Sequence, residues 1–307
     1  MGARLRDRAL TALGVVSDGG SDSLESRSGA SVGSVRRAGG ERAFLKVVPA
    51  SAGAMSLANA RNELRFYREL APVVPVRVPR LIDGWEDGDG VVLLLTHAGE
   101  PREAASWTPE LWATLGRDLA ALHTMPPPAA AGWERPDPLL AALDDPDLPG
   151  ITAFWGDALP QLAVLLSSAA EFRRRMEVPP PVFRHGDFHT DNITHRGASL
   201  VFCDWQTAGV GRPSTDLAFL SVRTTPGGTV VPPAFVDAYL AHRPVAVGDR
   251  AVWERALVAE ELATLLWLWP PFAAYNDAEG IARVRHRARA LADRFLYPKE
   301  RSPDPTG

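Results

Sequence analysis

The sequence contains a single cysteine, Cys203, and no long apolar run. One cysteine excludes both an internal disulfide framework and a cysteine-based zinc cluster. The longest apolar stretch, Leu262 to Trp269, spans eight residues and includes Thr264, whereas a membrane-spanning helix needs roughly 20 apolar residues. The first sixteen residues are charged and too weakly apolar for a signal peptide. We therefore expect a cytoplasmic protein without a membrane segment.

Lysine is scarce as well. Only two lysines, Lys46 and Lys299, occur among the 33 lysines and arginines. The formal net charge of -4 argues against a general nucleic-acid binder, whose domain is normally basic. The charge is uneven, because residues 1–96 hold 13 basic and 11 acidic residues while residues 97–307 hold 20 and 26. Lys46 lies in an apolar stretch, Phe44 to Val48, where a charge is costly without a partner.

The overall composition is that of a globular protein. Hydrophobic residues make up 46% of the chain and charged residues 23%, and a length of 307 residues suggests about two domains or two lobes. Glycine and proline separate segments of strand-like composition in the first hundred residues from longer segments of helical spacing after them. The expected strands are 23–27, 32–37, 41–48, 80–83 and 91–96; the expected helices are 55–70, 108–125, 153–175, 233–241, 249–269 and 279–295, with an irregular insert at 126–149.

This pattern predicts an α+β fold with two lobes. A small β-rich lobe is expected over residues 1–96, followed by a hinge at residues 97–100. A larger helical lobe is expected over residues 101–297. The tail, residues 298–307, is expected to be disordered, as chain ends often are.

The densest polar cluster lies in residues 183–220. Six polar residues fall within twenty positions: His185, Asp187, His189, Asp191, Asn192 and Asp204. The short pieces Ile193–Thr194 and Leu200–Phe202 flank a turn at Gly197 and predict a hairpin. A hairpin returns the chain on itself, so it brings Asp187 and Asn192 close to Asp204. Carboxylate and amide oxygens that converge in this way suit Mg²⁺.

The motifs in this cluster resemble those of a known family. H-G-D-x-H-x-x-N is followed by D-W and then by A-G-x-G-x-x-x-x-D-L-A, as in the aminoglycoside phosphotransferase family. The resemblance covers about residues 14–296 and is most specific in residues 183–220. It implies a protein-kinase-like two-lobed fold and ATP-dependent phosphorylation of a hydroxyl group with Mg²⁺. On this resemblance Asp187 is the catalytic aspartate, while Asn192 and Asp204 bind Mg²⁺.

The N-terminal part contains the other residues that a kinase needs. Kinases use a strand lysine on the α- and β-phosphates and a helix glutamate that holds this lysine. Lys46 and Glu63, 17 positions apart, match these two roles. The Ser- and Gly-containing loop at residues 28–34, which includes Ser31, is expected to cover the phosphates with backbone N–H groups. Thr96 to Ala98 are expected to form the hinge whose backbone meets the adenine.

Three other functions match parts of the pattern. A metal-dependent hydrolase would use the histidines and aspartates of residues 185–204, but such sites usually need further ligands, and Lys46 and Glu63 stay unexplained. A non-enzymatic module with a kinase fold is expected to lack catalytic residues, whereas all of them are present. A protein kinase is disfavoured because no activation segment with an A-P-E element follows Asp204.

The acceptor is expected to be a small molecule with a hydroxyl group, and no nucleic-acid or membrane partner is expected. The resemblance favours an aminoglycoside or another antibiotic; a choline-like alcohol or a sugar is the alternative. Acidic residues after position 97 favour a cationic or polyhydroxylated acceptor, unless they form a solvated surface: Glu134, Asp137, Asp144, Asp145, Asp147, Asp157, Glu260, Glu261 and Asp277. Trp253, Trp267 and Trp269 have helical spacing, which predicts core packing or else an acceptor-facing wall.

Overall fold

A computed structural model describes residues 2–18, 24–25, 30–243 and 249–298. The chain forms two compact units: the first comprises Met1–Arg102, His185–Asp187 and Asp191–Ala208, and the second Glu103–Arg184, Phe188–Thr190 and Gly209–Gly307. In the described ranges, no helix has the length and apolar composition that crossing a bilayer requires. The expectation of a disordered tail falls, apart from Pro298, outside the described residues.

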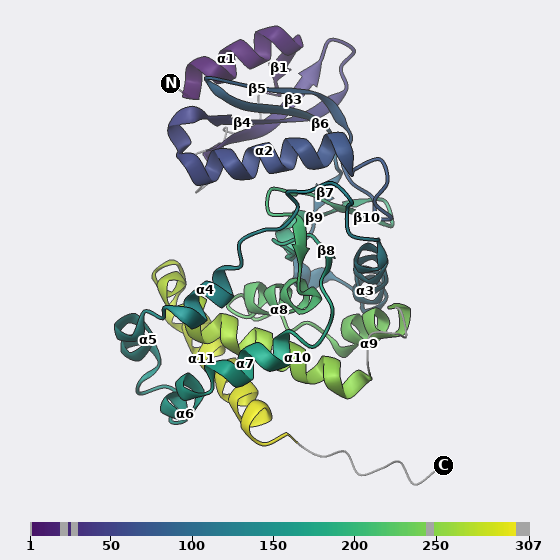
Figure 1. The fold of residues 1–307 in the computed structure, drawn as a ribbon. Coiled ribbons are helices and arrows are strands. Elements are labelled where there is room, and N and C mark those ends of the chain that lie inside the picture. Colours follow the sequence, from purple (N-terminus) through teal and green to yellow (C-terminus); the bar gives the residue numbers. More distant parts are fainter. Residues whose placement is uncertain (1, 19–23, 26–29, 244–248, 299–307) are drawn as a thin grey trace. The chain divides into compact units, whose positions relative to one another are not determined.

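The first unit is built on a six-stranded antiparallel sheet (Figure 1). The strand order is β1-β3-β4-β6-β5, and β2 pairs with β3. The strands are β1 Val15–Ser17, β2 Leu24–Glu25, β3 Ser31–Arg37, β4 Arg42–Pro49, β5 Leu81–Asp87 and β6 Gly90–Thr96. Helix α1, Gly2–Leu13, packs against β4, and helix α2, Ala54–Glu69, packs against β4, β5 and β6. The two helices cover opposite faces of the sheet.

Strand β4 is buried on both of these faces. Leu45 and Val47 belong to an apolar cluster that also contains Leu5 and Ala9 of α1. Successive side chains of a strand point to opposite faces. Lys46 therefore lies on the other face, the one that α2 covers. The alternation of β4 alone turns the lysine toward α2.

A three-stranded sheet completes the first unit. Its order is β10-β9-β7, with β7 Glu100–Pro101, β9 Ile193–Arg196 and β10 Ser199–Phe202. The turn between β9 and β10 contains Gly197 with a φ of 63°, a left-handed conformation that glycine adopts without strain. Because β9 pairs with β7, residues 191–208 group with the first unit, although their place in the sequence predicts the helical lobe.

The second unit is largely helical. Its described helices are α3 Pro109–Thr124, α4 Pro138–Asp144, α5 Leu148–Trp155, α6 Leu162–Ser167, α7 Ala169–Met176, α8 Pro213–Thr224, α9 Pro233–His242, α10 Arg250–Ala263 and α11 Ala278–Leu296. Two short strands, β8 Val182–Arg184 and β11 Gly209–Gly211, pair in antiparallel orientation. A large apolar core lies among α4 to α8, α10 and α11. Within it the ring of Phe172 stacks on Phe295 at 4.0 Å and contacts Trp267.

Two expectations from the sequence are wrong in detail. The single helix expected at 153–175 is replaced by the end of α5 and by α6 and α7, and the chain is interrupted around Gly156 and Pro160. Proline has no N–H for a helical hydrogen bond, and glycine is a poor helix former. The insert at 126–149 is not wholly irregular, because Asp137 accepts hydrogen bonds from two backbone N–H groups and caps α4. Helix α1 was not expected at all.

A buried ion pair anchors the start of α8. Arg212 donates to the carboxylate of Glu260 on α10 through Nε at 2.9 Å and Nη2 at 2.7 Å, and to Asp137 through Nη1 at 2.5 Å. The hydroxyl groups of Ser214 and Thr215 also donate to Glu260, which has no exposed surface. Burial opposes the charge on Arg212, but the carboxylates of Glu260 and Asp137 raise its pKa above the ordinary value.

This ion pair yields a prediction about stability. Replacing Glu260 by alanine (Glu260→Ala) removes the main partner of a buried guanidinium, and we expect the free energy of unfolding to fall by about 3 kcal/mol. The matched control is Glu254→Ala on the same helix, which breaks a partly exposed pair with Arg250 and should cost less than about 1 kcal/mol. Urea unfolding followed by circular dichroism measures both changes. Equal losses in the two variants would contradict the prediction.

Candidate active site

Lys46 lies between two carboxylates. Its Nζ is 2.6 Å from Oε2 of Glu63 on α2 and 2.7 Å from Oδ1 of Asp204, which follows β10. The side chains of Lys46 and Glu63 are 8% and 2% exposed, whereas that of Asp204 is 32% exposed. The structure thus brings together the lysine and the glutamate selected from the sequence, and it places beside them the selected Asp204, whose side chain a ligand can still reach.

The surroundings of Lys46 keep its amine protonated. Burial by itself acts to lower the pKa of this lysine, because it disfavours the charged form. The negative charges of Glu63 and Asp204 outweigh burial and raise the pKa above its ordinary value. Lys46 therefore carries a positive charge at physiological pH. Its two hydrogen bonds, to Glu63 and Asp204, fix the direction of its side chain.

The open end of the β9–β10 hairpin holds the other selected residues. The N–H of Cys203 donates to the carbonyl oxygen of Asn192 at 2.8 Å, which continues the ladder beyond the strands. Asn192 Nδ2 donates to the carbonyl oxygen of Asp187 at 2.9 Å and to its Oδ2 at 3.3 Å. Asp204 follows Cys203 directly. Asp187, Asn192 and Asp204 consequently lie at one end of the hairpin.

The backbone is unusual at both segments that meet there. Asp204 has a φ of 61° and is the only described residue other than glycine with φ in the left-handed region. Such a conformation costs about 1–2 kcal/mol and persists where the surroundings hold it. Gly186 lies so close to the segment after Asp204 that a Cβ would be 2.3 Å from the carbonyl oxygen of Thr207. The central residue of the H-G-D motif must therefore be glycine.

His185 cross-links the same two segments. Its Nδ1 accepts from the N–H of Asp187 at 3.3 Å, and its Nε2 lies 2.9 Å from the carbonyl oxygen of Cys203. The carbonyl requires a donor, so this network assigns the proton of a neutral imidazole to Nε2. The side chain has no exposed surface and its ring lies 4.5 Å from that of Trp205. Its contacts are thus with the loop, which it orders.

The loop expected at residues 28–34 is only partly a loop. Residues 28 and 29 lie outside the described part of the chain. Ser31 begins β3 and pairs with Val47, and its hydroxyl accepts a hydrogen bond from Arg6 at 3.0 Å. The expectation of a loop is wrong for residues 31–34, because their backbone groups pair along β4.

The two hinge residues selected from the sequence are held by neighbouring strands. Thr96 ends β6, and its hydroxyl accepts from the N–H of Arg80 at 2.9 Å. The carbonyl oxygen of Ala98 accepts from the hydroxyl of Thr194 on β9 at 3.0 Å. Gly99 follows with a φ of 111°, and a Cβ there would lie 2.2 Å from the carbonyl oxygen of His195. The hinge segment is therefore fixed against the hairpin.

The donor atoms of this site fit a divalent cation. Asn192 uses its side-chain amide hydrogens on Asp187, which leaves its side-chain oxygen Oδ1 as a ligand atom, and Asp204 keeps an accessible carboxylate. Three carboxylates accompany one ammonium group in the cluster, and such an excess of negative charge attracts cations. In the described ranges no group of three His, Cys, Asp or Glu could hold a metal ion. A cation here would need the Asn192 amide and substrate oxygens, as Mg²⁺ commonly does; the described residues contain no ligand set of the kind that a metal-dependent hydrolase needs.

Five of the nine acidic residues noted in the second unit have structural partners. Asp137, Asp147 and Asp277 accept hydrogen bonds from backbone N–H groups at the starts of α4, α5 and α11. The carboxylate of Glu260 accepts hydrogen bonds from Arg212, Ser214 and Thr215. Glu261 accepts from Arg287 at 2.6 and 2.7 Å and from the hydroxyl of Ser221 at 2.7 Å. The negative charge available to attract a cationic acceptor is therefore smaller than the sequence count suggests.

Other residues noted in the sequence serve the core of the second unit. Trp253, Trp267 and Trp269 are 1%, 7% and 4% exposed, which places all three in the core. Asp216, the aspartate of the A-G-x-G-x-x-x-x-D-L-A motif, has no exposed surface and lies 3.2 Å from Nε2 of His123, whose Nδ1 lies 2.9 Å from a tyrosine hydroxyl. Of the two alternatives for the tryptophans, core packing is the one observed.

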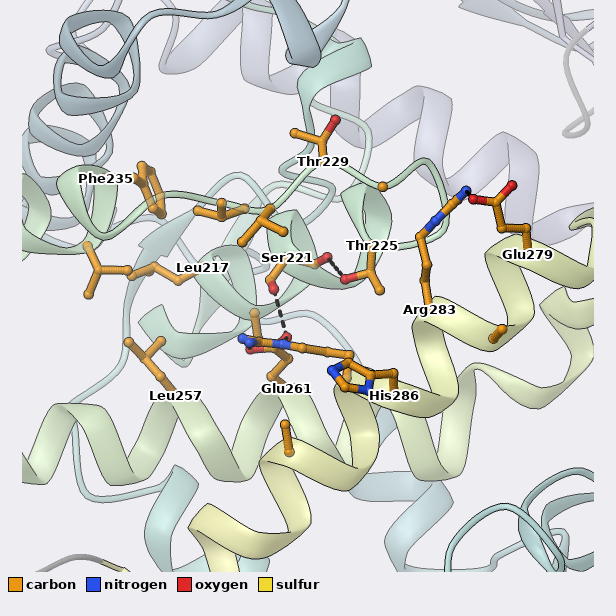
Figure 2. Close-up of a pocket in the computed structure, with 18 residues that line it drawn as sticks. Leu217, Ser221, Thr225, Thr229, Phe235, Leu257, Glu261, Glu279, Arg283 and His286 are labelled. Carbon is orange, nitrogen blue, oxygen red and sulfur yellow. Dashed lines mark hydrogen bonds and ion pairs between the residues drawn. The ribbon is translucent and has the colours of Figure 1, made fainter.

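A cavity of about 560 Å³ lies between α8, α9, α10 and α11 within the second unit (Figure 2). Leu217 and Phe235 contribute to an apolar side, and the paired charges of Glu261 and Arg287 contribute to a polar side. Its volume lies in the range of small-molecule sites. None of the residues around Lys46 or the hairpin lines it.

Two residues of α2 contact the segment after β10 although no motif in the sequence marks them. The ring of Phe66 stacks on Trp205 at 4.1 Å with an interplanar angle of 6°. The buried side chain of Asn62 donates two hydrogen bonds to backbone carbonyls of this segment. The one feature of the sequence that could have marked Asn62 is the presence of an asparagine, a poor helix former, next to Glu63 inside an expected helix. Its partners are backbone atoms, which no side-chain pattern can indicate.

Comparison with known proteins assigns the chain to a family. The model of the phosphotransferase enzyme family matches residues 25–254, more than half of the chain. The chain belongs to this family. It is a small-molecule phosphotransferase, and the resemblance to aminoglycoside phosphotransferases drawn from residues 183–220 is confirmed. A search of curated protein sequences found no significant match.

Solved structures with the same fold confirm the expected protein-kinase-like α+β class. A choline/ethanolamine kinase family protein from Mesorhizobium loti aligns with a TM-score of 0.62 and 20% identity over 95% of this chain and 97% of its own. An aminoglycoside phosphotransferase from Streptomyces rimosus aligns with a TM-score of 0.52 and 21% identity over 86% and 97%. An amicoumacin kinase in complex with AMP-PNP and Ca²⁺ aligns with a TM-score of 0.59 and 13% identity over 94% and 96%. These identities establish the fold and leave the substrate open.

The environment of Cys203 yields a prediction about reactivity. Burial raises the pKa of this thiol to about 11, so the thiolate that reacts with alkylating agents is scarce at neutral pH. At pH 8 we expect iodoacetamide to label the native protein at least about a hundredfold more slowly than the urea-unfolded protein. The native rate should rise about tenfold per pH unit toward pH 11. Mass spectrometry measures both rates, and equal rates at pH 8 would refute the raised pKa.

Proposed function

We propose that the protein transfers the γ-phosphate of ATP to a hydroxyl group of a small organic molecule, with Mg²⁺ as the divalent cation. The observation that carries this proposal is the buried ammonium of Lys46 between Glu63 and Asp204, in the same compact unit as Asp187 and Asn192. Phosphoryl transfer requires positioning and charge stabilisation more than covalent chemistry, and this is the residue set that kinases use for it. Membership of the phosphotransferase family supports the same conclusion.

On the nucleotide side, the proposal assigns Lys46 to the α- and β-phosphates. Its raised pKa keeps it charged, and Glu63 keeps it directed. The backbone of Thr96 and Ala98 would meet the adenine, and Ser31 at the start of β3 would lie near the phosphates. An ammonium held in advance loses little conformational freedom when the phosphates bind, which favours catalysis by positioning.

On the acceptor side, the proposal assigns the proton transfer to Asp187. The acceptor oxygen attacks the γ-phosphorus, the bond to the β-phosphate oxygen breaks, and Asp187 takes the hydroxyl proton. The hydrogen bonds from Asn192 hold the Asp187 carboxylate in place during this step. Asn192 and Asp204 would hold the divalent cation, which supplies positive charge to the phosphate oxygens.

For the acceptor we propose an aminoglycoside first and a choline-like alcohol or a sugar second. Solved relatives of this fold include kinases of both kinds. Structural partners of five of the nine acidic residues weaken one reason to expect a highly cationic acceptor. The test incubates the purified protein with ATP, Mg²⁺ and a panel of both classes, and mass spectrometry detects an added phosphate group. Absence of phosphorylation throughout a panel of hydroxyl compounds, together with absence of ATP binding, would refute the proposal.

The role of Asp187 can be tested by Asp187→Asn, which preserves shape and removes the base. We expect turnover of the best acceptor to fall roughly 10²–10⁴-fold, while ATP binding changes little. The matched control is Asp191→Asn, an exposed carboxylate in the same loop, which should keep turnover within about threefold. Steady-state kinetics and calorimetric ATP titration give the two readouts. Near-normal turnover of Asp187→Asn would remove this residue from the mechanism.

The nucleotide site can be tested by Asp204→Ala and by two changes of Lys46. Asp204→Ala should abolish the strengthening of ATP binding by Mg²⁺, because it removes a carboxylate ligand. Lys46→Ala should lower turnover, and Lys46→Arg should not restore it, because a planar guanidinium does not replace a compact ammonium. ATP titrations with and without Mg²⁺ measure the first effect. Identical Mg²⁺ dependence in Asp204→Ala and the wild type would contradict the assignment.

A further inference from the structure

Asn62 on α2 joins the helix to the chain that follows the metal-ligand candidate Asp204. Its Nδ2 donates to the carbonyl oxygen of Ala208 at 2.9 Å and to that of Gln206 at 3.2 Å. The side chain belongs to a residue that is only 7% exposed. Both hydrogens of one carboxamide are thus used on two carbonyls of one short segment.

That segment has little structure of its own. Residues 203–208 form neither helix nor strand, and they connect β10 to β11. At Asp204 the backbone is in the left-handed region, with a φ of 61°. A strained conformation of this kind persists only when the surrounding contacts determine it. The direction of the Asp204 carboxylate therefore depends on what holds the chain on both sides of it: His185 contacts the carbonyl oxygen of Cys203 before it, and residues 205–208 after it depend on other contacts.

Helix α2 provides these contacts from three positions within about one turn. Glu63 holds Lys46, which holds the Asp204 carboxylate, and Glu63 also accepts a hydrogen bond from the backbone of Trp205. Phe66 stacks on the ring of Trp205. Asn62 holds the segment farther along the chain, at the carbonyl groups of residues 206 and 208. Its two hydrogen bonds therefore fix the end of the segment that lies away from Asp204 in the sequence.

We infer that Asn62 is a positioning residue for phosphoryl transfer: by holding the carbonyls of Gln206 and Ala208, it sets the direction in which Asp204 presents its carboxylate to a divalent cation. This inference rests on the proposed function of Asp204. Asn62 itself touches neither substrate nor metal. Residues that orient a metal ligand through such contacts typically change metal affinity by about 10–100-fold when replaced.

The first experiment measures the segment directly and requires no activity. In Asn62→Leu, the side-chain volume is similar and both donors are lost. Hydrogen–deuterium exchange of the full-length protein should become at least about tenfold faster in a peptide covering residues 203–208. The matched control is Arg61→Ala, the neighbouring residue, whose partly exposed pair with Glu86 does not involve this segment; its exchange in this peptide should equal that of the wild type.

The second experiment measures the dependence on the divalent cation. In Asn62→Leu the Mg²⁺ concentration that gives half-maximal ATP binding should rise about tenfold, while ATP binding without Mg²⁺ and the acceptor KM stay within about twofold. Asn62→Gln keeps the carboxamide on a longer arm and should show a smaller shift than Asn62→Leu. If Asn62→Leu does not fold, Asn62→Ala removes the same donors with less volume.

The outcomes separate this inference from the proposed function. Unchanged exchange in residues 203–208, or faster exchange with unchanged Mg²⁺ dependence, would overturn the positioning role of Asn62. A general loss of stability with normal Mg²⁺ dependence would make the residue purely structural and would overturn it as well. A wild-type protein that binds no ATP with Mg²⁺ would instead refute the proposed function, and the positioning role of Asn62 would fall with it.

Discussion

The buried ammonium of Lys46 is the charge on which the arrangement of the first unit depends. The alternation of β4 puts this lysine under α2, where an isolated charge would be strongly unfavourable. Glu63 of α2 and Asp204 of the segment after β10 compensate it with hydrogen bonds of 2.6 and 2.7 Å. One interaction thus joins the sheet, the helix and the segment after β10. It also presents a fixed positive charge beside an accessible carboxylate.

Charges in the two units are used differently, and this difference separates the candidate site from the scaffold. In the second unit, Glu260 and Glu261 are enclosed by guanidinium and hydroxyl donors. Their carboxylates bind side chains of the same unit and so connect α10 to α8 and α11. Around Lys46, by contrast, Asp204 keeps about a third of its side chain exposed. A count of acidic residues does not distinguish these cases, whereas burial and hydrogen-bond partners do.

Much of the local structure could be predicted because it depends on neighbours in the chain. The hairpin at residues 193–202 follows from two β-compatible pieces around Gly197, and α3 follows from leucines in register after the N-cap Thr108. The secondary-structure prediction failed where helical spacing was compatible with either one long helix or several short ones. Residues 153–175 have helical spacing throughout, but Pro160 and the packing of α6 and α7 divide them. Helix α1 carries four charged residues among twelve, and its packing on the sheet is a tertiary effect.

The sequence by itself determined the chemistry that is available: a lone core lysine, a glutamate 17 positions on, and a dense group of oxygen ligands around one hairpin. It also carried enough motif to identify the family. Only the tertiary structure decided that Lys46 meets Asp204, 158 positions away, and that Asn62 holds backbone carbonyls after it. Spacing indicates which side chains share a strand, helix or turn. It does not indicate which distant carboxylate neutralises a buried charge, and a backbone carbonyl is the same whatever side chain its residue carries.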